Sequence, residues 1–215
     1  MHLLELASAN RALLRHMLQE THLEGRVKLH DFAASNETSS LQVVKGLYAG
    51  DERGSALTGK KARKYAAYSS QEKAVALDDF IKAQQLGSLY HVAIDTEGWD
   101  ALVVEGMRTT LSKKQVSILE FEVNDAGMWS HKTAGRDART VQGTLQLLQA
   151  AGYACFWVLT QSLVPASGEC WLADFGGPPK WSNMLCAYEP PVLAVLDAIA
   201  QEGYAARHGN RTRLL

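Results

Sequence analysis

The segment VAIDTEGWDALVVEGM, residues 92–107, joins a strand pattern to a helix pattern through a short acidic stretch. Its first three residues are apolar, which indicates a buried strand, and apolar residues then recur at helical spacing. Asp95 and Glu97 therefore stand where a predicted strand ends and a helix begins, with Gly98 available for the turn. In open α/β sheets, ligands bind outside such carboxyl ends of strands.

The same alternation of strand and helix patterns runs along the rest of the chain. It predicts βαβ units, an α/β fold with a mostly parallel sheet, and one domain over residues 1–215. The Gly-, Ser- and Lys-rich stretch 49–72 is expected to be a long loop. The expected strands are 3–5, 27–31, 40–48, 91–95, 115–123, 153–159 and 169–175, and the expected helices are 8–24, 76–87, 99–111, 138–151 and 190–203.

Composition excludes several classes of partner. The chain has 215 residues, 47% of them apolar, and a net charge of -1, which gives no electrostatic basis for binding nucleic acid or an anionic membrane. No apolar stretch approaches the roughly 18 residues of a membrane span. The first residues lack the pattern of a signal peptide, so we expect a cytoplasmic location.

The three cysteines, Cys155, Cys170 and Cys186, are odd in number and form no CxxC pair. This pattern favours buried or free thiols in a reducing compartment over a disulfide framework or a structural zinc site. No HxH or HExxH spacing occurs, so no metal is predicted.

Four blocks in order resemble the FkbM family of S-adenosylmethionine-dependent methyltransferases. The sharpest is residues 92–107 followed by QVSILEFE, residues 115–122, which resembles the family's Ile-Asp-x-Glu-Gly strand end, helix and Phe-Glu strand end. The resemblance covers about residues 2–125. It implies a Rossmann-like fold, S-adenosylmethionine as cofactor, and methylation of a hydroxyl on a small molecule or sugar. The other blocks are EKAVALDDFI (72–81), VKLHDFAASNETSSLQVV (27–44) and HLLELASANRALLRHML (2–18).

The family begins with a strand and a Gly-rich turn around the methionine end of the cofactor, and nothing before His2 supplies them. The resemblance therefore implies a fold without its first strand and first helix. That strand is central in the related sheets, so we expect the run 92–94 to lack a partner on one side, and the chain to be marginally stable or to self-associate through this edge. The alternative is that the two flanking strands, which end at Glu5 and Asp95, close up and pair. Two functions stay open: an active methyltransferase, and a non-catalytic remnant or binding module.

The resemblance assigns roles at the cofactor's nucleoside end. Glu5 corresponds to the acidic residue that accepts the ribose hydroxyls, and its alternative is a solvent-exposed strand end. Asp31 and Phe32 end the next strand, where such folds hold adenine. Their alternatives are a turn role for Asp31 and core packing for Phe32.

The reacting end is assigned to the acidic residues after the later strands. Asp95 and Glu97 are the catalytic candidates, because methyl transfer to a hydroxyl needs a base, and a carboxylate near the sulfonium stabilises its charge. Asp95 is also a cofactor contact, and its alternative is a helix cap. Glu122 is a candidate substrate contact, and His91 is interpreted as an ordinary packed residue. Four further side chains could line a substrate mouth or simply pack: Trp129, His131, Trp181 and Asn183.

Overall fold

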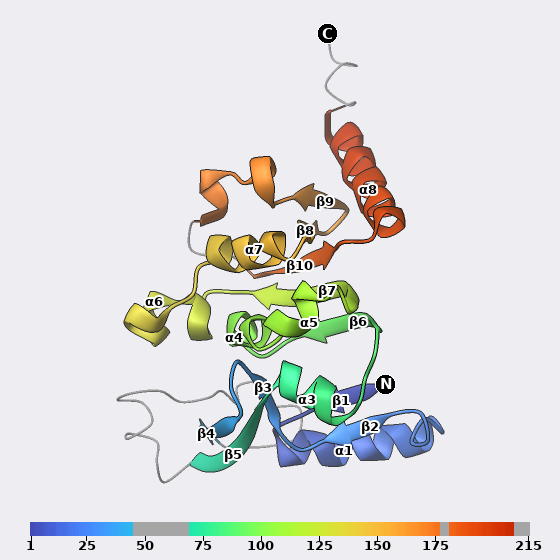
Figure 1. Cartoon of the computed structure of the whole chain (residues 1–215), viewed down its shortest axis with the longest axis vertical. Coiled ribbons are helices and arrows are strands. Elements are labelled where there is room, and N and C mark those ends of the chain that lie inside the picture. The colour runs from blue at the N-terminus through green and yellow to red at the C-terminus, as the bar shows by residue number, and fades with distance from the viewer. Residues whose placement is uncertain (45–68, 177–180, 209–215) are drawn as a thin grey trace. The chain divides into compact units, whose positions relative to one another are not determined.

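The computed structural model describes residues 1–44, 69–176 and 181–208 (Figure 1). The chain divides into two compact units, Met1–Ala83 and Gln84–Leu215, each with its own sheets. The prediction of one domain over residues 1–215 stays a prediction, because compactness alone does not decide whether the two units fold independently.

The first unit holds two small sheets. In one, β1 and β2 pair in parallel; in the other, β5 lies between β3, which is parallel to it, and β4, which is antiparallel. Helix α3 buries Leu77, Phe80 and Ile81, whereas α1 has no buried residue. The elements are β1 (His2–Leu4), α1 (Ser8–Glu20), β2 (Lys28–His30), β3 (Ala33–Ser35), β4 (Ser39–Val44), β5 (Ser69–Ala76) and α3 (Leu77–Ala83).

The second unit is built on one five-stranded sheet in the order β6-β7-β10-β8-β9. Only β6 and β7 are parallel; the other three pairings are antiparallel. The strands are β6 (Leu89–Ile94), β7 (Val116–Val123), β8 (Ala154–Leu159), β9 (Ser162–Pro165) and β10 (Ser182–Ala187). The helices are α4 (Asp100–Glu105), α5 (Arg108–Ser112), α6 (His131–Ala134), α7 (Val141–Ala150) and α8 (Pro190–His208), with 3₁₀ turns η2 (Gly127–Trp129), η3 (Gly135–Asp137), η4 (Gly168–Cys170) and η5 (Ala173–Gly176).

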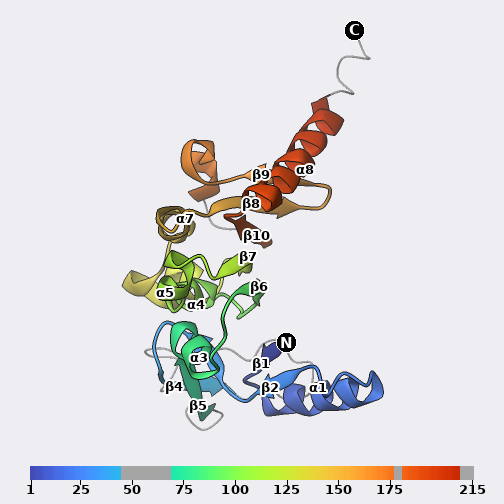
Figure 2. The same ribbon diagram turned by 45° about the vertical axis from the view of Figure 1, so that its right-hand side comes forward.

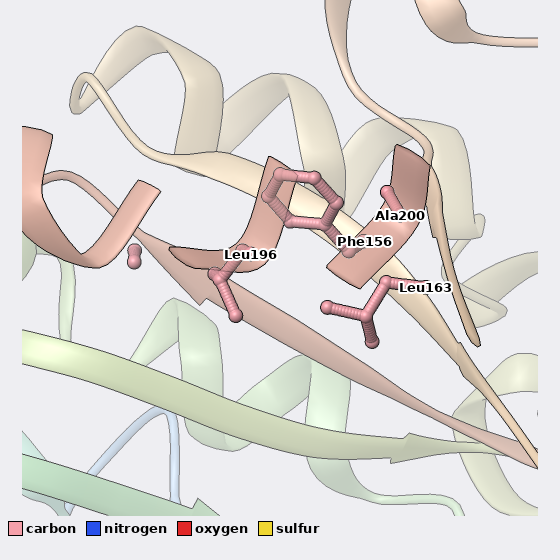
Figure 3. Close-up of a cluster of buried hydrophobic side chains, with 5 residues drawn as sticks. Phe156, Leu163, Leu196 and Ala200 are labelled. Carbon is pink, nitrogen blue, oxygen red and sulfur yellow. The ribbon is translucent and has the colours of Figure 1, made fainter. Parts of the chain in front are cut away.

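Helices cover this sheet from both sides. Figure 2 shows α4, α5 and α7 on one side of the strands and α8 on the other. Alternate residues of β7, namely Leu119, Phe121 and Val123, are completely buried, as expected for a face under helices. On the opposite face, α8 packs over β8 and β9 (Figure 3). The buried hydrophobic side chains of this packing, called the α8 cluster below, are Phe156, Leu163, Ala187, Leu196 and Ala200.

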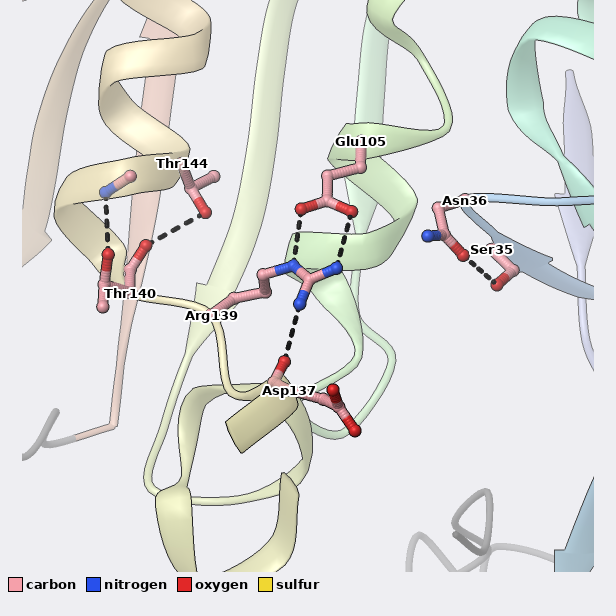
Figure 4. Close-up of polar contacts among 8 residues, drawn as sticks. Ser35, Asn36, Glu105, Asp137, Arg139, Thr140 and Thr144 are labelled. Atoms are coloured by element: carbon pink, nitrogen blue, oxygen red, sulfur yellow. Dashed lines mark hydrogen bonds and ion pairs between the residues drawn. The ribbon is translucent and has the colours of Figure 1, made fainter. Parts of the chain in front are cut away.

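A half-buried ion pair connects α4 to the chain entering α7 (Figure 4). The Arg139 guanidinium donates from Nε to Glu105 Oε1 at 2.6 Å and from Nη2 to Oε2 at 3.2 Å. Its Nη1 donates to the Asp137 carbonyl at 2.7 Å. The next residue, Thr140, caps α7 by accepting the Gly143 N–H at 3.0 Å. The bidentate geometry fixes the direction in which the chain enters α7.

Several sequence-based expectations are wrong in detail. The sheets are mixed rather than mostly parallel, because β4 pairs antiparallel with β5 and the strands after residue 153 also join by antiparallel pairing. The strand expected over 169–175 is not formed: the 3₁₀ turns η4 and η5 occupy most of these residues, and the strands that follow β8 are β9 and β10. Residues 69–72 begin β5 instead of continuing a loop, whereas 49–68 lie outside the described residues. The helix expected over 99–111 is two helices, α4 and α5.

The expectation of free thiols is also wrong for two of the cysteines. Cys155 on β8 and Cys186 on β10 lie directly opposite each other, with Cα atoms 4.1 Å apart, and form a disulfide. Both are buried, and Cys170 is free and exposed. The pairing depends on the register of two strands whose contact the spacing of cysteines does not reveal.

Strand β6 lies at one edge of its sheet and, among the described strands, pairs only with β7. This agrees with the expected lack of a partner on one side of residues 92–94. None of the helices in the described part of the chain has the length and apolar character needed to cross a membrane.

Candidate active site

The loop after β6 presents the two catalytic candidates. Asp95 is exposed, and Glu97 is half-buried with a left-handed backbone at φ +55°. Helix α4 begins after Trp99, and no side chain caps it. The helix-cap alternative for Asp95 therefore has no support, and its carboxylate lies at the carboxyl end of a parallel strand without a capping role.

Two glycines set the path of this loop. Gly98 has φ +89° and Gly127 has φ +51°. A Cβ on Gly98 would lie 2.6 Å from the carbonyl carbon and oxygen of Ala126, so no other residue fits without a shift. The Gly98 carbonyl accepts the Met128 N–H at 2.7 Å. The expectation that Gly98 serves the turn is confirmed, and the turn also packs directly against the segment after β7.

Asp100 connects the loop to the end of β7. Its side chain is completely buried. One carboxylate oxygen accepts the Thr96 hydroxyl at 2.9 Å, and the other accepts the Glu122 N–H at 3.2 Å. Burial, reinforced by the Glu122 charge, raises the pKa of Asp100 to about 7. This one side chain therefore holds the ends of two neighbouring parallel strands in register.

Glu122 is brought next to this loop. It is 8% exposed, and its carboxylate accepts from Asn124 Nδ2 at 2.7 Å and from the Trp181 indole N–H. Trp129 donates to the Glu122 carbonyl at 3.1 Å and stacks on Phe121, so the packing interpretation holds for Trp129. Glu122 thus lies in the same part of the second unit as Asp95 and Glu97.

Three other residues differ from their sequence-based interpretation or lie apart. His91 is not a packed residue: its side chain is 41% exposed and contacts Glu120 at 3.4 Å. His131 is exposed and contacts the Gly135 carbonyl. Trp181 is 79% exposed.

In the first unit, Glu5 and Asp31 directly follow the paired strands β1 and β2. The Glu5 N–H continues the ladder to the His30 carbonyl at 3.1 Å, which places Glu5 beside Asp31 at the carboxyl edge. The Glu5 carboxylate accepts the Ala7 N–H at 2.6 Å, so it also fixes the start of α1. Two carboxylates therefore lie at one strand edge.

Phe32 is buried in an aromatic cluster of its own unit. Its ring lies 5.6 Å from Phe80 and 5.4 Å from His30, and the Lys73 ammonium lies 5.5 Å from its centre. These contacts account for its burial, and its contact with adenine stays a prediction.

The nucleoside end of S-adenosylmethionine offers two ribose hydroxyls and an adenine amine, all of them hydrogen-bond donors. The carboxylates of Glu5 and Asp31 are acceptors, so the donor set of the ligand fits them. The described glycines with positive φ all lie in the second unit, so no Gly-rich turn beside Glu5 is seen among the described residues. Within the same residues, no group of three or more His, Cys, Asp or Glu could hold a metal.

Sequence reasoning missed Asp100. An acidic residue in the first turn of a helix ordinarily indicates a solvated charge near the positive end of the helix dipole. The available signal was its position two residues after Gly98, inside the acidic stretch itself.

Comparison with known proteins gives one family. The family model described as "Methyltransferase FkbM domain" matches residues 11–155. No curated protein matches the sequence. A solved structure of Methyltransferase FkbM from Methylobacillus flagellatus KT has 14% identity and a TM-score of 0.48 over 87% of this chain. The match covers 36% of that protein, so this chain spans about a third of its length.

Proposed function

Since the chain belongs to the FkbM methyltransferase family, we propose that it transfers the methyl group of S-adenosylmethionine to a hydroxyl of a small molecule or sugar. When bound, the cofactor supplies an electrophilic methyl group on a positively charged sulfur. Glu5 and Asp31 are the residues of this chain that would hold its ribose and adenine.

The observation that carries the proposal is the connection through Asp100. It joins the loop bearing Asp95 and Glu97 to the strand end bearing Glu122. Two carboxylates from the loop after β6 and one from β7 therefore lie at the carboxyl ends of two parallel strands, the place where ligands bind in open α/β sheets.

The roles follow from exposure. Asp95 is exposed, and its carboxylate would take the proton of the acceptor hydroxyl when that oxygen receives the methyl group. Glu97 has a left-handed backbone and lies on the same tight turn as Asp95. Its carboxylate would stabilise the positive charge of the cofactor's sulfur. Glu122, held by Asn124, orients the acceptor.

The test uses the full-length protein expressed from its gene. Calorimetry measures binding of S-adenosylmethionine, and radiolabelled methyl transfer to a panel of hydroxylated acceptors measures turnover. Asp95→Asn is expected to lower turnover by about 10²-fold or more while leaving the melting temperature near that of the wild type. Asp125→Asn, a change at another exposed acidic residue, is the matched control and should retain turnover.

Equal loss of stability and turnover in Asp95→Asn would contradict a catalytic role. Failure of the wild-type protein to bind S-adenosylmethionine would favour the non-catalytic remnant or binding module.

A further inference from the structure

Trp181 is a large aromatic side chain that lies on the surface just before β10. It is 79% exposed, yet its indole N–H donates to the buried carboxylate of Glu122. A hydrogen bond to a buried acceptor fixes the orientation of the ring while leaving most of it open to solvent.

Two further polar side chains lie on the same face of the sheet. Residues two apart on a strand share a face, so Glu120 lies beside Glu122 on β7, and Asn183 continues from Trp181 on β10. Asn183 Nδ2 donates to Glu120 Oε1 at 2.9 Å, in the diagonal pattern that Trp181 repeats with Glu122. Both contacts cross between the same two strands.

The third strand completes the ladder. His91 on β6 contacts Glu120 Oε2 at 3.4 Å, so Glu120 is held from both sides. Its side chain is still 31% exposed. His91, Glu120 and Asn183 thus form a row of polar side chains in contact with one another, beside the Trp181 ring. The row lies on the part of this sheet face that the α8 cluster does not cover.

The chemistry of this row selects one type of ligand. Glu120 Oε1 accepts the Asn183 amide N–H, and Oε2 lies 3.4 Å from His91 Nε2, so each oxygen keeps a lone pair and the carboxylate can accept a pair of neighbouring hydroxyls. The face of an indole suits the apolar C–H face of a sugar ring. The carboxylates disfavour a phosphorylated ligand. A quaternary ammonium is best held by a cage of several rings, whereas here one ring is present.

We propose that Trp181, Glu120 and Asn183 form a subsite for an uncharged pyranose sugar, with Glu122 positioning the Trp181 ring. The bound sugar is the methyl acceptor of this protein, an assignment that rests on the proposed function. The subsite narrows the acceptor class from hydroxylated small molecules to sugars.

Binding is measured without cofactor, by saturation-transfer NMR and by titration of the indole N–H signals of the full-length protein. The probes are the methyl α-glycosides of glucose, galactose and mannose, with glucose 6-phosphate and tetramethylammonium for comparison. At least one neutral glycoside should bind and receive saturation on the protons of one ring face. Trp181→Ala should weaken its binding by about tenfold.

Three variants separate the roles. Trp181→Phe keeps a ring but loses the N–H held by Glu122, so it should bind between wild type and Trp181→Ala. Glu120→Gln should weaken binding without changing the melting temperature. Tyr204→Ala removes another exposed aromatic, 68% exposed on α8, and should bind as the wild type does.

No binding of any neutral glycoside, or tighter binding of tetramethylammonium or of the phosphorylated sugar, would overturn the inference. Unchanged binding in Trp181→Ala would overturn it as well. Methyl transfer to a non-sugar hydroxyl with no glycoside bound would remove the sugar subsite and leave the proposed function intact. Glycoside binding without any S-adenosylmethionine binding would remove the methyltransferase and leave the sugar site.

Discussion

The carboxylate of Asp100, which is completely buried, accepts the backbone N–H of Glu122 from the neighbouring strand at 3.2 Å. Its second oxygen accepts the Thr96 hydroxyl. This long-range contact fixes where the loop after β6 lies relative to β7.

Removing this carboxylate is expected to destabilise the second unit. Asp100→Ala leaves the Glu122 N–H and the Thr96 hydroxyl without their partner, at a cost of about 1–3 kcal/mol for each buried group. Asp100→Asn should cost less, because its amide oxygen can still accept the N–H while the Thr96 hydroxyl accepts from the amide nitrogen. Urea unfolding at pH 7 measures both. Equal stability of Asp100→Ala and wild type would contradict the structural role.

The raised pKa of Asp100 also predicts a pH dependence. Burial raises its pKa to about 7, so between pH 4 and pH 7 the folded chain binds this proton more tightly than the unfolded chain. Its contribution to stability therefore falls as the pH rises through this window, by about 4 kcal/mol at most. The difference in unfolding free energy between wild type and Asp100→Asn, followed from pH 4 to pH 8, isolates the contribution of Asp100 ionisation to stability. A pH-independent difference would show that the carboxyl titrates normally.

Lowering the pH should destabilise the first unit, whereas it should stabilise the second unit through Asp100. His2 Nδ1 and His30 Nε2 lie 3.0 Å apart with stacked rings, bridging β1 and β2. Burial lowers the pKa of both, and the charge of His30 lowers that of His2 further. Below pH 6.5 the unfolded chain therefore binds more protons at these two histidines than the folded chain does. The contribution of the pair to stability is present above pH 6.5 and is lost as the pH falls through the lowered folded-state pKa values.

Hydrogen-exchange protection of the β1 and β2 amides, compared at pH 7.5 and pH 5.5, measures this effect. Protection should drop at the lower pH in the wild type and much less in His2→Gln, which does not titrate. His16→Gln, on the exposed side of α1, is the control and should behave as the wild type does. Constant protection in the wild type would rule out the coupling.

The part of the fold that sequence predicts best is the part determined by local pattern. The strand, turn and helix over 92–107 are found because apolar periodicity changes at Asp95 and only Gly suits the backbone at Gly98. The segment 169–175 misleads because its Cys, Trp, Leu and Phe suggest a strand, although none of its residues pairs in a sheet. Local composition does not report which segments meet.

The candidate site, too, was predictable from sequence only in part. The acidic strand ends were predictable, because they follow apolar runs. The partners of those residues were not, since Asp100 to Glu122, Cys155 to Cys186 and Trp181 to Glu122 each depend on sheet register. Contacts of this type join residues 22, 31 and 59 positions apart, beyond the reach of periodicity.

Gly98 should resist substitution. An alanine there would hold a strained left-handed backbone and place its Cβ 2.6 Å from the Ala126 carbonyl, so we expect a loss of about 2–4 kcal/mol. Gly87→Ala is the matched control, because nothing lies within 4 Å of its Cβ position. Thermal unfolding compares the two. Similar melting temperatures for both variants would mean that the loop after β6 tolerates a side chain and does not depend on this close approach.

The edge strand β6 predicts self-association of the 215-residue chain. Leu89 donates to the Gln115 carbonyl of the β7 side, so by alternation the backbone groups of Tyr90, Val92 and Ile94 face away from β7. The strand carries no Lys, Arg, Asp, Glu or Pro that would prevent a second strand from pairing with it. Two copies can add their β6 strands antiparallel across a two-fold axis, which makes the contact self-complementary.

Size-exclusion chromatography with light scattering measures this association. Tyr90 is 76% exposed, so Tyr90→Lys adds a charge to the edge without disturbing the core and should convert dimer to monomer. Tyr204→Lys adds the same charge at a residue 68% exposed on α8 and should leave the dimer intact. A wild-type chain that elutes as a sharp monomer and unfolds cooperatively would contradict the prediction, because an unpaired apolar edge would then be tolerated or covered within one chain.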